Sequence, residues 1–230
     1  QKAERSGRYS HEDDARFTEQ WSRIIMHLPY AFQAKRMFPD VFRHDREDTE
    51  MWQEVAEQLG PAPEPHNSDD PVIVEIWEKA MDGYRRAISK TPQYLDFHAS
   101  RIEKGQRASS LIGNQYTGSI FLALMSTFES DLEENVNLDN KFFGLCGYGS
   151  GAKAKVFEGK VSPRWREVVS RWSLFERLAG RVAIDHITYE NLHKGLQSGS
   201  VVEPEGEFAL VEIGESGVQE GARRYKWIDA

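Results

Sequence analysis

The stretch from Gly113 to Phe128 constrains the fold most, because a glycine-asparagine turn comes directly before a long apolar run. Gly113 and Asn114 are typical of a tight turn, since glycine permits close backbone approach and asparagine offers a short amide. Thr117 stands where a helix N-cap is expected. The apolar residues that follow would cover most of a helix circumference: Ile120, Phe121, Ala123, Leu124, Met125 and Phe128. The pattern predicts a buried helix whose N-terminus directs polar groups and N–H donors into a pocket, with an ordinary capped core helix as the alternative.

A histidine stands at the end of a predicted strand. Residues 24–28 form a continuous apolar run closed by Pro29, which predicts a short buried strand with His27 at its C-terminal end. In open α/β sheets, ligands bind at this edge. The alternative is a core histidine whose ring is satisfied by backbone groups.

A second buried strand is predicted at residues 141–146, and it opens into a glycine loop from Gly147 to Gly151. Alternating glycines after a strand indicate close backbone approach or a tight turn. The spacing differs from a dinucleotide-binding fingerprint. Residues 152–161 alternate as a strand with one solvated face, so the two strands are expected to be antiparallel neighbours. Cys146 lies in the buried strand, where a thiol has a raised pKa and low reactivity, and we interpret it as structural rather than as a nucleophile.

The rest of the chain is mostly helical by pattern. Apolar spacing and capping residues predict helices at residues 13–23, 30–38, 50–59, 71–90, 91–102 and 163–180, a helix from Tyr189 capped by Thr188, and a C-terminal hairpin of strands 207–214 and 221–229. Residues 105–112 are expected to lead into the central turn as an extended segment. The acidic segment 40–70, with one amphipathic helix and a proline-rich loop, is expected to be a solvated surface insertion.

Charge and composition exclude several classes of function. The net charge of −8 argues against a nucleic-acid surface, no apolar run is long enough to span a bilayer, and no signal-peptide pattern is present. A single cysteine permits no internal disulfide and fits a reducing compartment such as the cytoplasm. The seven histidines lack metal-site spacing. His27, Asn114 and the glycine loop remain as donors suited to an oxyanion formed from a thioester or ketone, but this set lacks a nucleophile.

Three segments in this order, IIMHLPYAFQAKRMF, GNQYTGSIFLAL and LCGYGSGAKAKVF, resemble the second half of 3-hydroxy-3-methylglutaryl-CoA (HMG-CoA) synthase. The resemblance covers residues 21–161 well and the C-terminal hairpin less closely. It implies an α/β fold of thiolase-like type, in which a mixed sheet is layered with helices around a buried central helix. It also implies an acyltransferase of the mevalonate route to isoprenoids, which condenses acetyl-CoA with acetoacetyl-CoA through an acetyl group carried on a cysteine.

The resemblance implies roles for individual residues. His27 matches the histidine that holds and polarises the acetoacetyl group, and Asn114 matches the asparagine that contacts this group, so these two are the expected catalytic positions. The implied substrate-binding positions are Pro29, Tyr30, Lys35, Arg36, Tyr116, Gly147, Tyr148 and Ser150. Two positions depart from the family pattern. Gly147 stands where the family often has a serine, and Phe32 stands where it often has a lysine that meets CoA, which leaves Arg36 and its basic neighbour for that end.

In the family, the nucleophilic cysteine and the general-base glutamate precede the histidine motif, but only about 26 residues precede His27, too few for half of the fold. We therefore expect this sequence, which starts at Gln1, to supply one half of an active site and to be inactive by itself. A companion N-terminal half, on the same or a separate chain, would supply the rest. The resemblance implies a homodimer of the complete enzyme, with coenzyme A thioesters as substrates and no other cofactor. Two alternatives remain: a carrier-protein-dependent synthase of polyketide β-branching, and a non-catalytic half that binds acyl-CoA.

Overall fold

The computed structural model describes residues 16–149 and 153–229. The chain divides into two compact units, the first ending at Leu178 and the second beginning at Ala179. The described part of the first unit contains a three-stranded sheet with helices around it, and that of the second contains a two-stranded hairpin and a helix. No helix in the described ranges is both long enough and apolar enough to cross a membrane.

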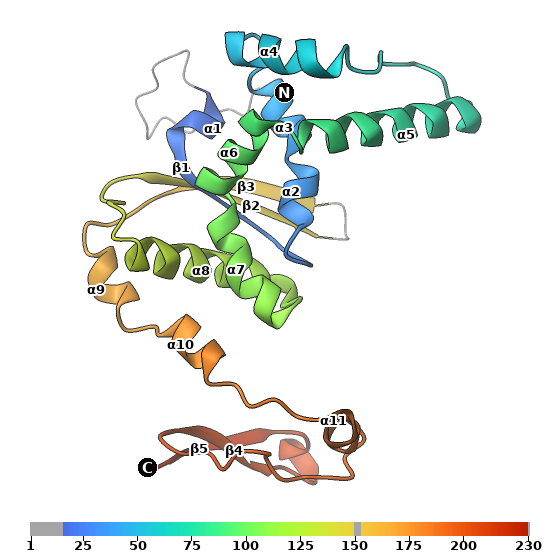
Figure 1. Cartoon of the computed structure of the whole chain (residues 1–230). Helices are drawn as coiled ribbons and strands as arrows, with labels where there is room; N and C mark the ends of the chain where they lie inside the picture. The colour runs from blue at the N-terminus through green and yellow to red at the C-terminus, as the bar shows by residue number, and fades with distance from the viewer. Residues whose placement is uncertain (1–15, 150–152, 230) are drawn as a thin grey trace. The chain divides into compact units, whose positions relative to one another are not determined.

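A mixed sheet with strand order β1-β2-β3 forms the centre of the first unit (Figure 1). β1 (Trp21–Met26) pairs in parallel with β2 (Phe142–Gly149), which pairs antiparallel with β3 (Lys153–Lys160). The predicted antiparallel neighbours are therefore confirmed. Gly147 and Gly149 continue β2 instead of forming the expected loop, because they pair with residues 155 and 153 of β3.

The helix α8 (Ser119–Glu133) packs on β1 and β2 and runs antiparallel to both. Ser119, in its first turn, lies beside His27, which follows the end of β1. Asp131, in its last turn, pairs with Arg23 near the start of β1. The predicted central helix is therefore present, although exposed Phe121 shows that it is not covered on every side.

The helix α7 (Glu103–Ile112) packs along α8, so the prediction of an extended segment at residues 105–112 was wrong. Gly105 lets the two helices approach closely, because a Cβ atom there would lie 3.3 Å from Thr127 Oγ1. The buried polar side chains of Gln106, which contacts His98 of α6, and Ser109 weaken the apolar pattern that would have revealed a helix.

The other helices of the first unit follow the predicted order with shifted ends. They are α1 (Phe17–Gln20), α2 (Gln33–Met37), α3 (Pro39–His44), α4 (Glu50–Leu59), α5 (Pro71–Ile88), α6 (Pro92–Arg101) and α9 (Trp165–Val169), with α10 (Leu174–Ala179) at its end. The helix expected to reach Arg23 ends at Gln20, because the following residues enter the sheet. Pro39 begins a further helix rather than only ending one.

Segment 40–70 contributes to the core and is not only a solvated surface. Phe42, Trp52 and Val55 are buried in the main apolar cluster. The guanidinium of Arg46 lies over the rings of Phe42 and Phe97, 4.6 and 4.8 Å from their centroids. The acidic composition of this segment concealed these contacts.

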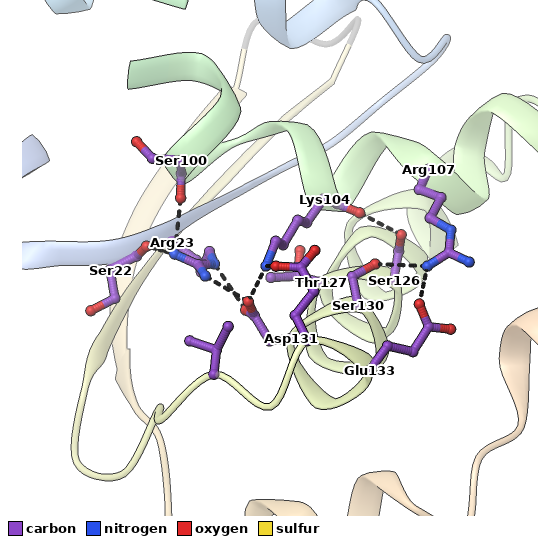
Figure 2. A network of polar contacts seen from close by, with 12 residues as sticks. Ser22, Arg23, Ser100, Lys104, Arg107, Ser126, Thr127, Ser130, Asp131 and Glu133 are labelled. Atoms are coloured by element: carbon purple, nitrogen blue, oxygen red, sulfur yellow. Dashed lines mark hydrogen bonds and ion pairs between the residues drawn. The ribbon is translucent and has the colours of Figure 1, made fainter. Parts of the chain in front are cut away.

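A buried carboxylate ties α7, α8 and β1 together (Figure 2). Asp131 is fully buried and accepts hydrogen bonds from Arg23 Nε and Nη2 at 2.8 and 2.5 Å and from Lys104 Nζ at 2.6 Å. Arg23 Nη1 also donates to the carbonyl oxygens of Ser22 and Ser100. The charge is thus matched by two cations, as a buried ion requires.

The second unit contains α11 (His186–His193), the antiparallel strands β4 (Glu207–Ile213) and β5 (Arg223–Ile228), and a short 3₁₀ turn, η2 (Gly217–Gln219). The predicted hairpin is confirmed. Thr188 is not the helix cap, because the Asp185 carboxylate accepts the Thr188 N–H at 2.7 Å and starts the helix three residues earlier.

Candidate functional site

A cavity of about 340 Å³ lies at the carboxyl ends of the parallel strands β1 and β2. The residues that line it are His27, Tyr116, Thr117, Ile120, Gly147, Tyr148 and Gly149. They come from the residue after β1, the turn before α8, the first turn of α8 and the end of β2. Ligands bind at this edge in open α/β sheets. The structure thus brings four of the predicted site residues together, namely His27, Tyr116, Gly147 and Tyr148.

The backbone around His27 is held on both sides. The His27 N–H donates to the carbonyl oxygen of Cys146 at 3.0 Å, and the Leu28 N–H donates to Ser119 Oγ at 3.1 Å. The same Oγ lies 2.6 Å from His27 Nδ1. Nε2 has no hydrogen-bond partner among the described residues, and the half-buried ring lines the cavity. His27 therefore presents one ring nitrogen to a ligand, which distinguishes it from a core histidine.

Tyr148 meets the imidazole of His27 edge-on, with ring centroids 5.0 Å apart. Its hydroxyl is buried and has no hydrogen-bond partner in the part of the chain that the structure describes. Burial raises the pKa of this hydroxyl, so it is neutral near pH 7. The amide of Gln33 lies close enough to oppose that shift, and it donates one hydrogen bond to Met37 Sδ. A buried polar atom without a partner beside a cavity indicates a ligand group.

Asn114 shapes the turn that leads to the cavity. Gly113 ends α7 with φ of +91°, and Asn114 Oδ1 accepts the Tyr116 N–H at 2.7 Å. Tyr116 has φ of +48°, a left-handed conformation that is uncommon for an aromatic residue and is often found at functional sites. Asn114 itself is exposed and is not among the residues that line the cavity. Contact between its amide nitrogen and a substrate therefore stays a prediction.

Thr117 is not the N-cap of α8. A 3₁₀ turn, η1 (Tyr116–Gly118), comes between the Gly-Asn turn and α8 and moves the cap to Gly118. Thr117 lines the cavity instead. The sequence pattern placed the helix cap one residue too early, because it could not distinguish the 3₁₀ turn from the first turn of the helix.

The predicted basic positions lie apart from this cavity. Arg36, on α2, donates to the hydroxyl of Tyr30 at 3.0 Å. It lines a separate cavity of about 70 Å³ together with Arg85 and Arg86 at the end of α5. Pro29 and Lys35 are two more predicted positions. Neither lines the cavity beside His27 or the cavity beside Arg36, as far as the described residues show. The remaining predicted position, Ser150, lies outside the described residues.

Sequence reasoning missed Ser119 and the two arginines of α5. Ser119 was visible only as a hydroxyl near a helix start, and the contact of this buried side chain with His27 joins residues 92 positions apart. Arg85 and Arg86 form a basic pair in the last turn of α5, where cations are favourable for the helix itself. That local role gave no reason to connect them with Arg36.

Cys146 does not have the properties of a nucleophile. Burial raises the pKa of its thiol to about 11, so the thiol stays protonated near neutral pH. It is also absent from the residues that line the cavity. Among the described residues, no group of three or more His, Cys, Asp or Glu side chains is placed to hold a metal ion.

Comparison with known proteins identifies the family and the fold. The family model of the hydroxymethylglutaryl-coenzyme A synthase C terminal matches residues 2–198. A hydroxymethylglutaryl-CoA synthase of Haloferax volcanii is 27% identical over 212 residues, which cover 90% of this chain and 46% of that protein. One of Enterococcus faecalis is 31% identical over 91 residues, 40% of this chain and 23% of that protein. The chain thus spans less than half the length of these relatives.

Solved structures match the fold over nearly the whole chain. MvaS in complex with 3-hydroxy-3-methylglutaryl coenzyme A aligns with a TM-score of 0.63 at 23% identity, over 95% of this chain and 44% of that one. The HMG synthase of the curacin biosynthetic pathway, in complex with holo donor-ACP, aligns with a TM-score of 0.58 at 16% identity, over 93% and 44%. The predicted α/β fold, the C-terminal half of a thiolase-like protein, is confirmed.

Proposed function

The chain belongs to the hydroxymethylglutaryl-coenzyme A synthase C-terminal family, and we propose that it supplies the histidine half of the active site of an HMG-CoA synthase. The proposed reaction condenses acetyl-CoA with acetoacetyl-CoA to form HMG-CoA, in the mevalonate route to isoprenoids. The complete enzyme is proposed to be a cytoplasmic homodimer with no cofactor beyond its CoA thioesters.

The observation that carries this proposal is the position of His27 at the carboxyl end of β1, with Nδ1 engaged and Nε2 without a partner among the described residues, beside a cavity. When the enolate carbon of an acetyl group attacks the ketone carbon of an acetoacetyl group, the carbonyl oxygen gains negative charge. A ring N–H placed against that oxygen stabilises the charge and can supply the proton that makes it a hydroxyl. The neutral hydroxyl of Tyr148 can add a second polar contact.

The proposal assigns the nucleophilic cysteine and the general base to a companion half. Cys146 is unsuited to the first role because its thiol stays protonated. Large apolar side chains near the site are exposed: Phe32 is 66%, Tyr116 76%, Phe121 61% and Val156 62% exposed. Large exposed apolar side chains are consistent with a surface that another protein layer covers. This chain covers 46% of its Haloferax volcanii relative, and the remaining part of such a protein could supply that layer.

The second cavity is the proposed contact for the phosphates of CoA. Arg36, Arg85 and Arg86 line it together with Asp82 and Ser89, and guanidinium groups bind phosphates in a bidentate manner. Arg85 is already paired with Asp40 and Asp82, at 2.6 and 2.8 Å. Arg36 and Arg86 are therefore the stronger candidates, with the neighbouring Lys35 as a further cation.

The test is turnover of acetyl-CoA and acetoacetyl-CoA by a preparation that contains the companion half. His27→Ala should lower the rate roughly 10²–10⁴-fold by removing the proton donor, and Asn114→Ala roughly 10²–10³-fold if its amide meets the oxyanion. His44→Ala, an exposed histidine on α3, is the matched control and should leave the rate within a few-fold.

Three other results would change the assignment. A rate for His27→Ala within a few-fold of the wild type would show that the histidine role is wrong. Condensation only when a carrier protein delivers the acetyl group would favour the polyketide type of synthase. Acyl-CoA binding without condensation, in the intact complex, would favour a non-catalytic half.

A further inference from the structure

We propose that Ser119 is a positioning residue that fixes the tautomer of His27, with the proton on Nε2 and the lone pair on Nδ1. The fixed tautomer is a property of the fold, and only its catalytic consequence rests on the proposed function. Ser119 is the first residue of α8 and is fully buried. Its hydroxyl touches two groups whose hydrogen-bonding capacities differ.

The first group is the backbone N–H of Leu28, 3.1 Å from Ser119 Oγ. An amide N–H can only donate, so the serine oxygen is the acceptor in this contact. The hydroxyl then has one proton to donate. Nδ1 of His27, at 2.6 Å, is the acceptor that the described residues offer to it. A hydroxyl that accepts from Leu28 and donates to Nδ1 satisfies all three groups at once.

The opposite tautomer leaves a group unsatisfied. If Nδ1 carried the proton, both Nδ1 and the Leu28 N–H would donate to the serine oxygen. The serine proton would then be buried with no acceptor among the described contacts of Ser119, which is costly for a fully buried donor. The 2.6 Å separation also suits a hydroxyl donor, since O–H donors make shorter hydrogen bonds than N–H donors.

The other contacts of the ring leave Ser119 as the hydrogen-bond partner of Nδ1 within the described chain. Tyr148 contacts it edge-on, and the Cys146 carbonyl is occupied by the His27 N–H. No carboxylate forms an ion pair with His27 within the described chain. In serine proteases a carboxylate orients the histidine and stabilises its cation. A serine hydroxyl that donates to Nδ1 leaves the ring proton on Nε2, so an N–H donor faces the cavity.

Long-range ¹H–¹⁵N correlation spectra of ¹⁵N-histidine-labelled protein, prepared with its companion half, report which ring nitrogen carries the proton. The wild type should show His27 as the Nε2–H tautomer, and Ser119→Ala should release this preference and give a mixture. Ser126→Ala is the matched control, because Ser126 is also fully buried on α8, accepts the Ala108 N–H at 3.1 Å and donates to the Lys104 carbonyl at 2.6 Å. It should leave the His27 signals unchanged.

An Nδ1–H tautomer in the wild type would overturn the inference, and this result does not depend on whether Ser119→Ala folds. Unchanged Nε2–H signals in folded Ser119→Ala would also overturn it. Under the proposed function, Ser119→Ala should lower kcat at least about tenfold, a part of the roughly 10²–10³ that a hydrogen-bond donor to an oxyanion contributes, with a smaller change in KM. An equal loss in Ser126→Ala would mean a general structural effect. A wild type that lacks synthase activity but shows the Nε2–H tautomer would refute the proposed function and support this inference.

Discussion

The polar groups at the two ends of the parallel pair β1–β2 differ in whether they have hydrogen-bond partners. At the amino end, the buried carboxylate of Asp131 is held by Arg23 and Lys104 (Figure 2). At the carboxyl end, His27 Nε2 and the Tyr148 hydroxyl have no partners in the described chain and lie beside a cavity of about 340 Å³. The helix α8 reaches both ends, because it runs antiparallel to the strands.

The polar groups at the amino end therefore serve the stability of the fold, and those at the carboxyl end serve its function. A polar group that is buried and fully paired holds elements together, and its loss affects stability. A buried polar group that lacks a hydrogen-bond partner and lies beside a cavity can bind a ligand, and its loss affects binding or rate. Stability and activity measured on matched variants can therefore test the contrast.

Asp131→Ala should have the largest effect on stability. It leaves Arg23 and Lys104 without their shared anion inside the protein and should lower the free energy of unfolding by about 3–5 kcal/mol, measured by urea denaturation. Glu133→Ala removes the half-exposed partner of Arg107 two residues further along α8 and should cost about 1 kcal/mol or less. Similar costs for both variants would contradict the structural role given to Asp131.

Glycine-to-alanine substitutions at two positions of β2 compare the packing at the two ends of this strand. A Cβ atom at Gly144 would overlap the indole ring of Trp21, so Gly144→Ala should destabilise the protein by about 1–3 kcal/mol. A Cβ atom at Gly147 would lie 3.8 Å from Ile120 Cδ1, an ordinary contact. Gly147→Ala should therefore change stability by about 0.5 kcal/mol or less. Thermal unfolding of the pair gives the answer, and equal shifts would show that the cavity end is packed as tightly as the core end.

A smaller effect is the pH dependence of stability that His98 contributes. His98 is 5% exposed and hydrogen-bonded to Gln106 at 2.8 Å, and burial lowers its pKa below the ordinary value of 6.5, aided by Lys35 and opposed by Glu103 and by the Gln106 hydrogen bond. The unfolded chain therefore takes up the proton first as the pH falls. The stability contributed by neutral His98 is present above about pH 6.5 and is lost below it.

The measurement is the unfolding free energy of the wild type and of His98→Gln at about pH 7.5 and pH 5.5. The wild type should lose more stability between these values than the variant, which has no titrating ring at this position. The same loss in both proteins would show that other groups determine the acid sensitivity.

Local patterns predicted the elements that carry the site, because continuous apolar runs and glycine turns have local causes. They placed His27 at a strand end and a helix after Gly113. They failed for α7, where Gly105 suits the packing against α8 and the buried Gln106 contacts His98 of α6, so neither residue marks a helix by itself. Ser119 could not be found, since its role depends on a histidine 92 positions away.

The parallel pairing of β1 and β2 also sets the order in which the molecule can fold. Lys104 and Asp131 are 27 positions apart, so the helical hairpin of α7 and α8 closes a short loop and can form early. Trp21 and Glu158, which form a hydrogen bond, are 137 positions apart. The strand β1 can pair with β2 only after the ribosome has synthesised this much later segment. During synthesis the buried residues Ile24 and Ile25 therefore remain without their sheet, and the cavity around His27 is among the last parts of the chain to assemble.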